Sequence, residues 1–196
     1  MLNIKFEKIF TISNFISSIR LILIFPTIYL LKGIGEHDSY RIYILLIFAL
    51  AYLSDLLDGY LARKFNEISE LGKIIDPLAD KIFVIAVVIQ LFLYDEITSF
   101  YFWVIILRDV VIFLGGIYVS KTIGRILPSN LLGKMTVASI GLFLIAVVAG
   151  LETIPLLYNF IQYLSILLSF ASVLGYGLRA YETIKWHKKN GISKEY

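Results

Sequence analysis

The chain has 196 residues, of which 59% are hydrophobic and only 17% are charged, and its formal net charge is +3. A soluble domain has about 45–50% apolar and about 25% charged residues, so this chain holds more apolar side chain than one soluble core can bury. The absence of cysteine excludes disulfides, thiolate metal ligands and thiol nucleophiles. We therefore expect a membrane protein with no nucleic-acid partner.

The first segment is expected to form a short amphipathic helix on the membrane surface. In residues 3–12, Ile4 and Phe6 alternate with Lys5 and Glu7, a pattern typical of a helix lying at the interface. A frayed terminus is the alternative interpretation. No small-residue cleavage site precedes a long apolar run, so a cleaved signal peptide is not expected.

Six apolar stretches follow, each long enough or nearly so to cross a hydrocarbon core of about 30 Å. They lack sustained period-two alternation, which favours helices over barrel strands. The stretches cover residues 15–31, 40–61, 74–94, 100–120, 131–151 and 154–178. We predict an all-α integral membrane protein with six transmembrane helices and an N-terminal amphipathic surface helix. In domain terms, residues 1–196 form one domain, with a juxtamembrane helix (1–13), a six-helix bundle (14–178) and a basic cytoplasmic tail (179–196).

The distribution of Lys and Arg predicts the orientation. The loops on one side contain most of these residues, whereas the loops on the other side contain only Lys32 and Arg41, beside acids such as Glu36 and Glu96. Cytoplasmic loops carry the excess of positive charge. Both termini and the basic loops are therefore expected on the cytoplasmic side of the cell (inner) membrane, with the basic segment 185–189 contacting anionic membrane lipids.

Four aspartates flank the short loop between the second and third predicted helices. Asp55 and Asp58 are three residues apart, and Asp76 and Asp80 are four apart, so each pair shares a helix face. The short loop makes the two helices antiparallel neighbours, which lets the four carboxylates converge near the cytoplasmic boundary. Pro77 either starts the third helix, with Asp76 as its N-cap, or kinks a helix already running.

Electrostatics makes this cluster informative. Two like charges about 6 Å apart repel by roughly 3 kcal/mol at an effective dielectric of 20, so four aspartates repel by on the order of 10–20 kcal/mol. Arg63 and Lys81 alone do not offset this repulsion, whereas two divalent cations would cancel the four negative charges. Oxygen-only ligands favour Mg²⁺ or Mn²⁺ over zinc. The predicted ligands of the two ions are Asp55, Asp58, Asp76 and Asp80.

Small residues accompany the acids. Gly59 and Ala62 are three apart on the second predicted helix, and Gly72 opens the third. Small residues let a second helix or a flat ligand approach closely, so helix packing alone is the alternative explanation. Arg63 follows Gly59 by one turn and can clamp a phosphate with its planar guanidinium.

The whole pattern, Asp-x2-Asp-Gly-x2-Ala-Arg-x8-Gly-x3-Asp-x3-Asp, resembles the signature of the CDP-alcohol phosphotransferases. This chain fills all eight positions with Asp55, Asp58, Gly59, Ala62, Arg63, Gly72, Asp76 and Asp80. The chain length and the expected spans are also similar to that family. In the first predicted span, Asn14-x5-Arg20-x5-Pro26 resembles the start of bacterial phosphatidylglycerophosphate synthases.

The resemblance implies a phosphatidyltransferase that moves a phosphatidyl group from CDP-diacylglycerol to an alcohol and releases CMP. It implies that the donor diphosphate bridges two Mg²⁺ ions, with Mn²⁺ as a possible substitute, and that Asp80 is the general base that deprotonates the acceptor hydroxyl. It also implies a homodimer. The implied CDP-binding residues are Asp58, Gly59, Ala62, Arg63, Gly72 and Asp76.

Cations later in the chain are candidates for binding a phosphorylated acceptor such as glycerol 3-phosphate. They are Arg108, Arg125, Lys134 and Arg179, together with Ser129. A local ion pair with Asp109 is the alternative for Arg108, and snorkelling to the interface is the alternative for Arg125 and Arg179.

The acceptor itself has alternatives. Many phosphatidylglycerophosphate synthases carry Gly-Lys-x-Lys-Thr, but residues 133–137 read Gly-Lys-Met-Thr-Val and lack the second lysine. Residues 108–110, Arg-Asp-Val, resemble cardiolipin synthases of the same family, whose acceptor is phosphatidylglycerol. An inositol phosphate acceptor is a third possibility.

Three other classes of protein are alternatives to the transferase. A magnesium channel or transporter predicts ionisable residues along the full depth of the membrane, whereas the outer halves of these spans are apolar. A membrane prenyltransferase also uses two acid clusters, but with an Asn/Asp-x3-Asp spacing. A non-enzymatic assembly factor derived from an enzyme would not need every motif position, whereas this chain fills all eight.

Overall fold

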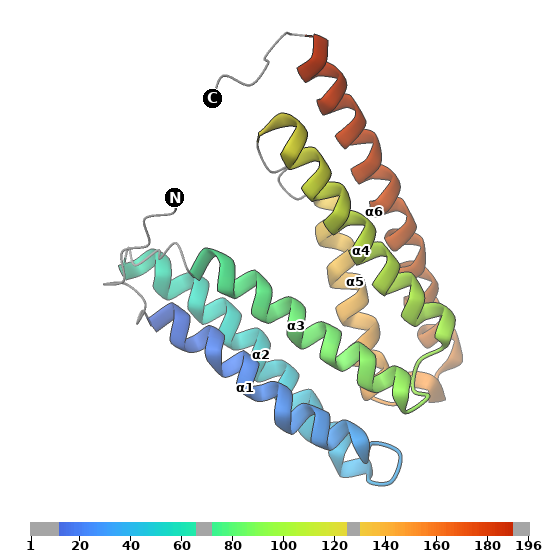
Figure 1. The fold of residues 1–196 in the computed structure, drawn as a ribbon. Helices are drawn as coiled ribbons and strands as arrows, with labels where there is room; N and C mark the ends of the chain where they lie inside the picture. The colour runs from blue at the N-terminus through green and yellow to red at the C-terminus, as the bar shows by residue number, and fades with distance from the viewer. Residues whose placement is uncertain (1–11, 66–71, 125–129, 190–196) are drawn as a thin grey trace. The chain divides into compact units, whose positions relative to one another are not determined.

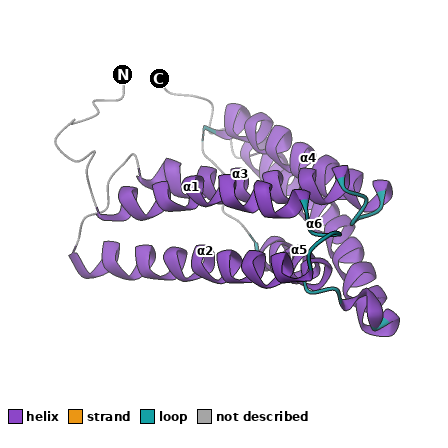
Figure 2. Cartoon of the chain, turned by 90° about the horizontal axis from the view of Figure 1, so that it is seen from below, coloured by secondary structure: helices purple, strands orange, loops and turns teal. Residues whose placement is uncertain are grey.

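The computed structural model describes residues 12–65, 72–124 and 130–189, with side chains described over 18–57, 79–124, 130–187 and at 189. Over these residues the chain is helical and contains no strand, which confirms the all-α prediction (Figure 2). The helices are α1 (Ile12–Lys32), α2 (Asp38–Phe65), α3 (Gly72–Leu93), α4 (Ser99–Ile123), α5 (Leu131–Val148) and α6 (Pro155–Lys189), with a short 3₁₀ turn η2 (Leu151–Thr153) before α6. The surface helix expected over residues 1–13 falls almost wholly outside the described residues and stays a prediction.

The six helices coincide with the six expected stretches, with two informative differences. Helix α6 continues to Lys189, eleven residues past the expected end of the last span at residue 178. Hydropathy falls there, but Glu, Lys, Ala and Arg are good helix formers, so backbone bonding continues beyond the apolar run. Helix α3 begins at Gly72, so Pro77 lies inside it and Asp76 is not its N-cap. Pro77 removes one backbone hydrogen bond near the start of the helix.

The chain divides into two compact units, Met1–Glu96 and Ile97–Tyr196. In the first unit, α1 packs along both α2 and α3 (Figure 1). Over the described residues, α2 and α3 share no comparable backbone interface, although their side chains meet where the rings of Phe48 and Phe83 lie 5.9 Å apart, edge to face. Helices α2 and α3 are therefore neighbours through their side chains, as expected, while α1 packs more extensively along both.

In the second unit, α6 packs against both α4 and α5. The ring of Phe143 on α5 lies 4.3 Å from that of Tyr101 on α4 and 5.1 Å from that of Tyr158 on α6. Phe143 and Tyr101 are fully buried. Aromatic pairs at this separation add to the stability gained from the buried area alone. This cluster therefore joins all three helices of the unit.

Polar side chains also join α6 to its neighbours. The serines Ser165, Ser169 and Ser172 are buried along one face of α6. The hydroxyls of Ser165 and Tyr101 are 2.8 Å apart, and Thr136 on α5 donates to the carbonyl of Leu168 at 3.0 Å. In an apolar surrounding, such hydrogen bonds between helices satisfy groups that have no water to bind. They fix which face of α6 points inward.

The outward faces of the helices are apolar, as a lipid-facing surface requires. Large side chains such as Phe25 and Leu156 are 74% and 86% exposed. Among the described residues, four helical segments are long and apolar enough to cross a membrane, within α2, α4, α5 and α6. The chain is therefore a membrane protein.

Phe143→Ala tests the aromatic cluster. Removal of a fully buried ring leaves a cavity and costs about 3 kcal/mol or more, so we expect a clear loss of thermal stability of the protein in detergent. Phe113→Ala on α4 is the control, because Phe113 is 61% exposed. Equal melting temperatures for the two variants would contradict the packing described for this unit.

Candidate active site

Two of the four motif aspartates converge on one arginine. Nη1 of Arg20 on α1 lies 3.4 Å from Oδ1 of Asp55 on α2 and also forms an ion pair with Oδ1 of Asp80 on α3. At about 1.5 Å per residue, Arg20 and Asp80 each lie about 12 Å from the start of their helices, and Asp55 lies about 15 Å from the end of α2. The packing of α1 along α2 and α3 places all three groups at one level of the unit.

The three groups differ sharply in exposure. The side chain of Arg20 is 2% exposed, whereas those of Asp55 and Asp80 are 51% and 46% exposed. The cation therefore lies beneath the two carboxylates, which keep an open side. A buried guanidinium is costly unless acids pair with it. Asp55 and Asp80 supply that pairing and can still meet a ligand from the open side.

The remaining motif residues are placed by their helices alone. Asp58, Gly59, Ala62 and Arg63 lie in α2 after Asp55. Gly72 is the first residue of α3, and Asp76 lies in the same helix four residues before Asp80. The spacings of three and four residues are therefore helical, as expected. The side chains of these six residues lie outside the described residues, so their predicted roles in binding CDP and metal stay predictions.

The donor set near Arg20 fits a hard divalent cation. Asp55 and Asp80 offer only oxygen donors, and Mg²⁺ is commonly held by one or two carboxylates together with water and substrate phosphates. Among the described side chains, no group of three or more His, Asp or Glu residues gathers as a metal site. That group would need Asp58 or Asp76, whose side chains are not described. The two-carboxylate pair is thus the described part of the expected metal site.

Arg108, a candidate for acceptor binding, has its own partners in the second unit. Its Nη1 lies 2.6 Å from Oδ1 of Asp109, and its Nε donates to the hydroxyl of Ser172 on α6 at 3.2 Å. The local ion pair considered from the sequence is therefore present. It neutralises the charge of Arg108 without a ligand.

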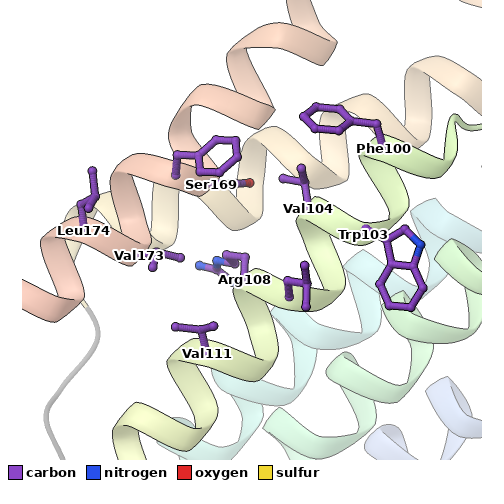
Figure 3. Close-up of a pocket in the computed structure, with 10 residues that line it drawn as sticks. Phe100, Trp103, Val104, Arg108, Val111, Ser169, Val173 and Leu174 are labelled. Atoms are coloured by element: carbon purple, nitrogen blue, oxygen red, sulfur yellow. The ribbon is translucent and has the colours of Figure 1, made fainter.

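Arg108 also lines a groove between α4 and α6, with a volume of about 480 Å³. Figure 3 shows its guanidinium pointing from α4 toward Val173 of α6. Aromatic and aliphatic side chains form the rest of the wall, including Phe100, Trp103 and Phe170, and Arg108 is the only charged residue among those lining the groove. The groove suits a hydrocarbon chain with one polar group better than a small phosphorylated alcohol.

The other acceptor candidates are less defined. Lys134 lies exposed near the start of α5, and Arg179 lies part-buried in α6. Arg125 and Ser129 lie outside the described residues. The acceptor roles predicted for these residues therefore stay predictions.

Arg20 is the residue that the sequence reasoning left without a role. It appeared only as part of a pattern in the first predicted span. One signal was available: an ionisable side chain inside a membrane helix usually faces the bundle interior and pairs with an opposite charge. The sequence could not identify the acids with which it pairs.

Asp109→Asn tests the pairing of Arg108. Arg108 and Asp109 are 11% and 23% exposed, and removing one partner leaves the other charge unpaired in a largely apolar surrounding, so we expect reduced thermal stability in detergent. The double variant Arg108→Met, Asp109→Asn should recover most of the lost thermal stability, because no unpaired charge remains. A stable single variant would show that the pair is dispensable.

Comparisons with known proteins show the family to which the chain belongs. The family model for CDP-alcohol phosphatidyltransferase matches residues 10–174. A CDP-diacylglycerol–glycerol-3-phosphate 3-phosphatidyltransferase from Aquifex aeolicus (strain VF5) is 31% identical over 179 residues, covering 88% of this chain and 97% of that protein. A protein of the same name from Mycoplasma pneumoniae (strain ATCC 29342 / M129 / Subtype 1) is 42% identical over 89 residues, covering 45% of this chain and 38% of that protein.

A relative with a different name is also similar. A cardiolipin synthase (CMP-forming) from Streptomyces coelicolor (strain ATCC BAA-471 / A3(2) / M145) is 31% identical over 134 residues, covering 67% of this chain and 61% of that protein. The family match spans most of the chain, and the Aquifex relative aligns over nearly its whole length. The chain therefore belongs to the CDP-alcohol phosphatidyltransferase family.

Proposed function

We propose that this enzyme transfers the phosphatidyl group of CDP-diacylglycerol to glycerol 3-phosphate and releases CMP. The observation that carries the proposal is the convergence of Asp55 and Asp80, from two separate helices, within a completely filled family motif. The names of the Aquifex and Mycoplasma relatives support glycerol 3-phosphate as the acceptor.

Each motif residue has a proposed task. The four aspartates would hold two Mg²⁺ ions, which would supply positive charge to the donor diphosphate and to CMP as it leaves. Backbone at the small residues Gly59, Ala62 and Gly72 allows the cytidine to approach the helices, and Arg63 clamps a phosphate. The proposed CDP-binding residues are Asp58, Gly59, Ala62, Arg63, Gly72 and Asp76.

Asp80 is proposed as the general base. Its carboxylate is 46% exposed, so an acceptor hydroxyl can reach it and transfer a proton to it. The hydroxyl oxygen then bonds to the lipid-bearing phosphorus, the bond from that phosphorus to CMP breaks, and Asp80 carries the proton. No covalent enzyme intermediate is needed.

Cardiolipin synthesis is the second candidate function, and one observation favours it. The groove lined by Arg108 is apolar, which suits an acceptor with acyl chains such as phosphatidylglycerol. The Streptomyces relative bears the name cardiolipin synthase. The full-length similarity to the Aquifex protein keeps glycerol 3-phosphate as the preferred acceptor.

An assay of CMP release distinguishes the two. Purified protein is supplied with Mg²⁺, CDP-diacylglycerol and either glycerol 3-phosphate, phosphatidylglycerol or inositol phosphate. We expect release with glycerol 3-phosphate, and loss of release when EDTA removes the metal. Asp80→Asn should lower kcat by about 100-fold or more, because a general base contributes that much.

Asp38→Asn is the matched control for that assay. Asp38 is an exposed acid in the first turn of α2, outside the motif. It should retain wild-type kcat. Full activity of Asp80→Asn would remove Asp80 as the base, and release with phosphatidylglycerol alone would establish the second candidate.

We further propose six membrane spans, a homodimer, and both termini and the active site on the cytoplasmic side of the cell membrane. The excess of Lys and Arg in one set of loops supports this orientation. Because the chain contains no cysteine, single cysteines report on topology without background.

Cysteine labelling tests the orientation. Glu36→Cys, in the exposed loop after α1, should react with a membrane-impermeant maleimide on intact cells. Lys189→Cys, at the end of α6, should react only after permeabilisation. The opposite pattern would invert the proposed orientation.

A further inference from the structure

We propose that Arg20 is a positioning residue that competes with the divalent metal for Asp55 and Asp80. It holds the two acids together when no ion is bound, and it thereby weakens the binding of the ion. This inference rests on the proposed function, because it takes these two aspartates as metal ligands.

A single nitrogen, Nη1 of Arg20, meets Oδ1 of both Asp55 and Asp80. These are the oxygens of a donor set that suits Mg²⁺. Arg20 therefore uses the same carboxylates that a metal ion would use, and it draws them together from two different helices.

The positive charge of Arg20 is permanent. A guanidinium stays protonated in proteins, so Arg20 cannot become neutral when an ion arrives. Its side chain is 2% exposed, so water screens its charge poorly. Without metal, that charge offsets the repulsion between the two carboxylates. With metal, the same charge repels the ion that takes over the carboxylates.

Thermodynamic linkage connects the contacts of Arg20 to the metal affinity of the protein. A residue that stabilises the metal-free protein more than the metal-loaded protein lowers the metal affinity by that difference. A residue with a purely structural role stabilises both forms equally and leaves the affinity unchanged. The affinity for metal therefore separates the two roles, whereas thermal stability alone does not.

The experiment is a titration of the full chain in detergent with Mn²⁺. Electron paramagnetic resonance measures the concentration of free Mn²⁺ at each step. Arg20→Gln should bind Mn²⁺ about tenfold more tightly than wild type, within the usual range of coupling between two sites. Without metal it should also melt at a lower temperature, and Mn²⁺ should raise its melting temperature more than that of wild type. Arg20→Lys keeps the charge and should bind Mn²⁺ within about threefold of wild type.

Arg41→Gln is the matched control. Arg41 on α2 pairs with Glu96 at 3.9 Å in the same unit, and neither residue belongs to the motif. This variant should leave the affinity for Mn²⁺ unchanged even if it melts at a lower temperature. An equal gain of Mn²⁺ affinity in Arg41→Gln would show that removal of any positive charge from this unit raises the affinity, and that the effect is not specific to Arg20.

Other outcomes overturn the inference. An unchanged affinity in Arg20→Gln would make Arg20 purely structural, and a weaker affinity would mean that it prepares the site for metal and does not oppose it. Arg20→Lys binding as tightly as Arg20→Gln would exclude the charge as the cause.

A measurement on the wild-type protein covers the case in which Arg20→Gln fails to fold without metal. In protein labelled with ¹⁵N-arginine, the side-chain resonance of Arg20, assigned by its loss in Arg20→Lys, should shift on addition of Mg²⁺, since its carboxylate partners turn to the ion. An unshifted resonance at saturating Mg²⁺ would overturn the inference.

Failure of this inference and failure of the proposed function give different results. If Arg20→Gln binds Mn²⁺ more tightly but the wild-type protein releases no CMP, the proposed function is wrong and the competition between Arg20 and the metal is supported. Metal-dependent CMP release with unchanged Mn²⁺ affinity in Arg20→Gln would do the reverse.

Discussion

Negative charge gathered between membrane helices requires nearby positive charge, and this constraint governs the first unit of the protein. The repulsion between carboxylates on different helices would drive the helices apart if no cation lay between them. Arg20 meets that need from α1, the helix that packs along both α2 and α3. The same contact keeps α1, α2 and α3 aligned at the level where the family motif places its acids.

Arg20 and Arg108 differ in the origin of the acids with which they pair. Arg20 draws its partners from two other helices, so its ion pairs depend on the fold. Arg108 pairs with Asp109, the next residue of its own helix, so that ion pair needs no acid from another helix. The first arrangement links distant parts of the chain around a site. The pair of Arg108 with Asp109 neutralises a charge inside an apolar groove. The hydrogen bond to Ser172 orients the guanidinium of Arg108.

Packing in the second unit relies on contacts that suit an apolar surrounding. The aromatic cluster around Phe143 fills space, and the serines of α6 provide hydrogen bonds to α4. Gly115 on α4 allows a close approach, because an added Cβ would lie 3.3 Å from the ring of Tyr176 on α6. Lipid gives no hydrophobic drive for helices to associate, so shape and hydrogen bonding must select the partners.

The sequence by itself determined the helices and the family, because hydropathy and motif spacing are local properties that a chain carries before it folds. Asp55 and Asp80 were identified in this way, and their helical spacing from Asp58 and Asp76 was correct. Only the tertiary structure decided that α1 packs along both acid-bearing helices and that Arg20 is the cation beneath two of their acids. These contacts join residues 35 or more positions apart, so they depend on how helices pack and not on any periodicity within one helix.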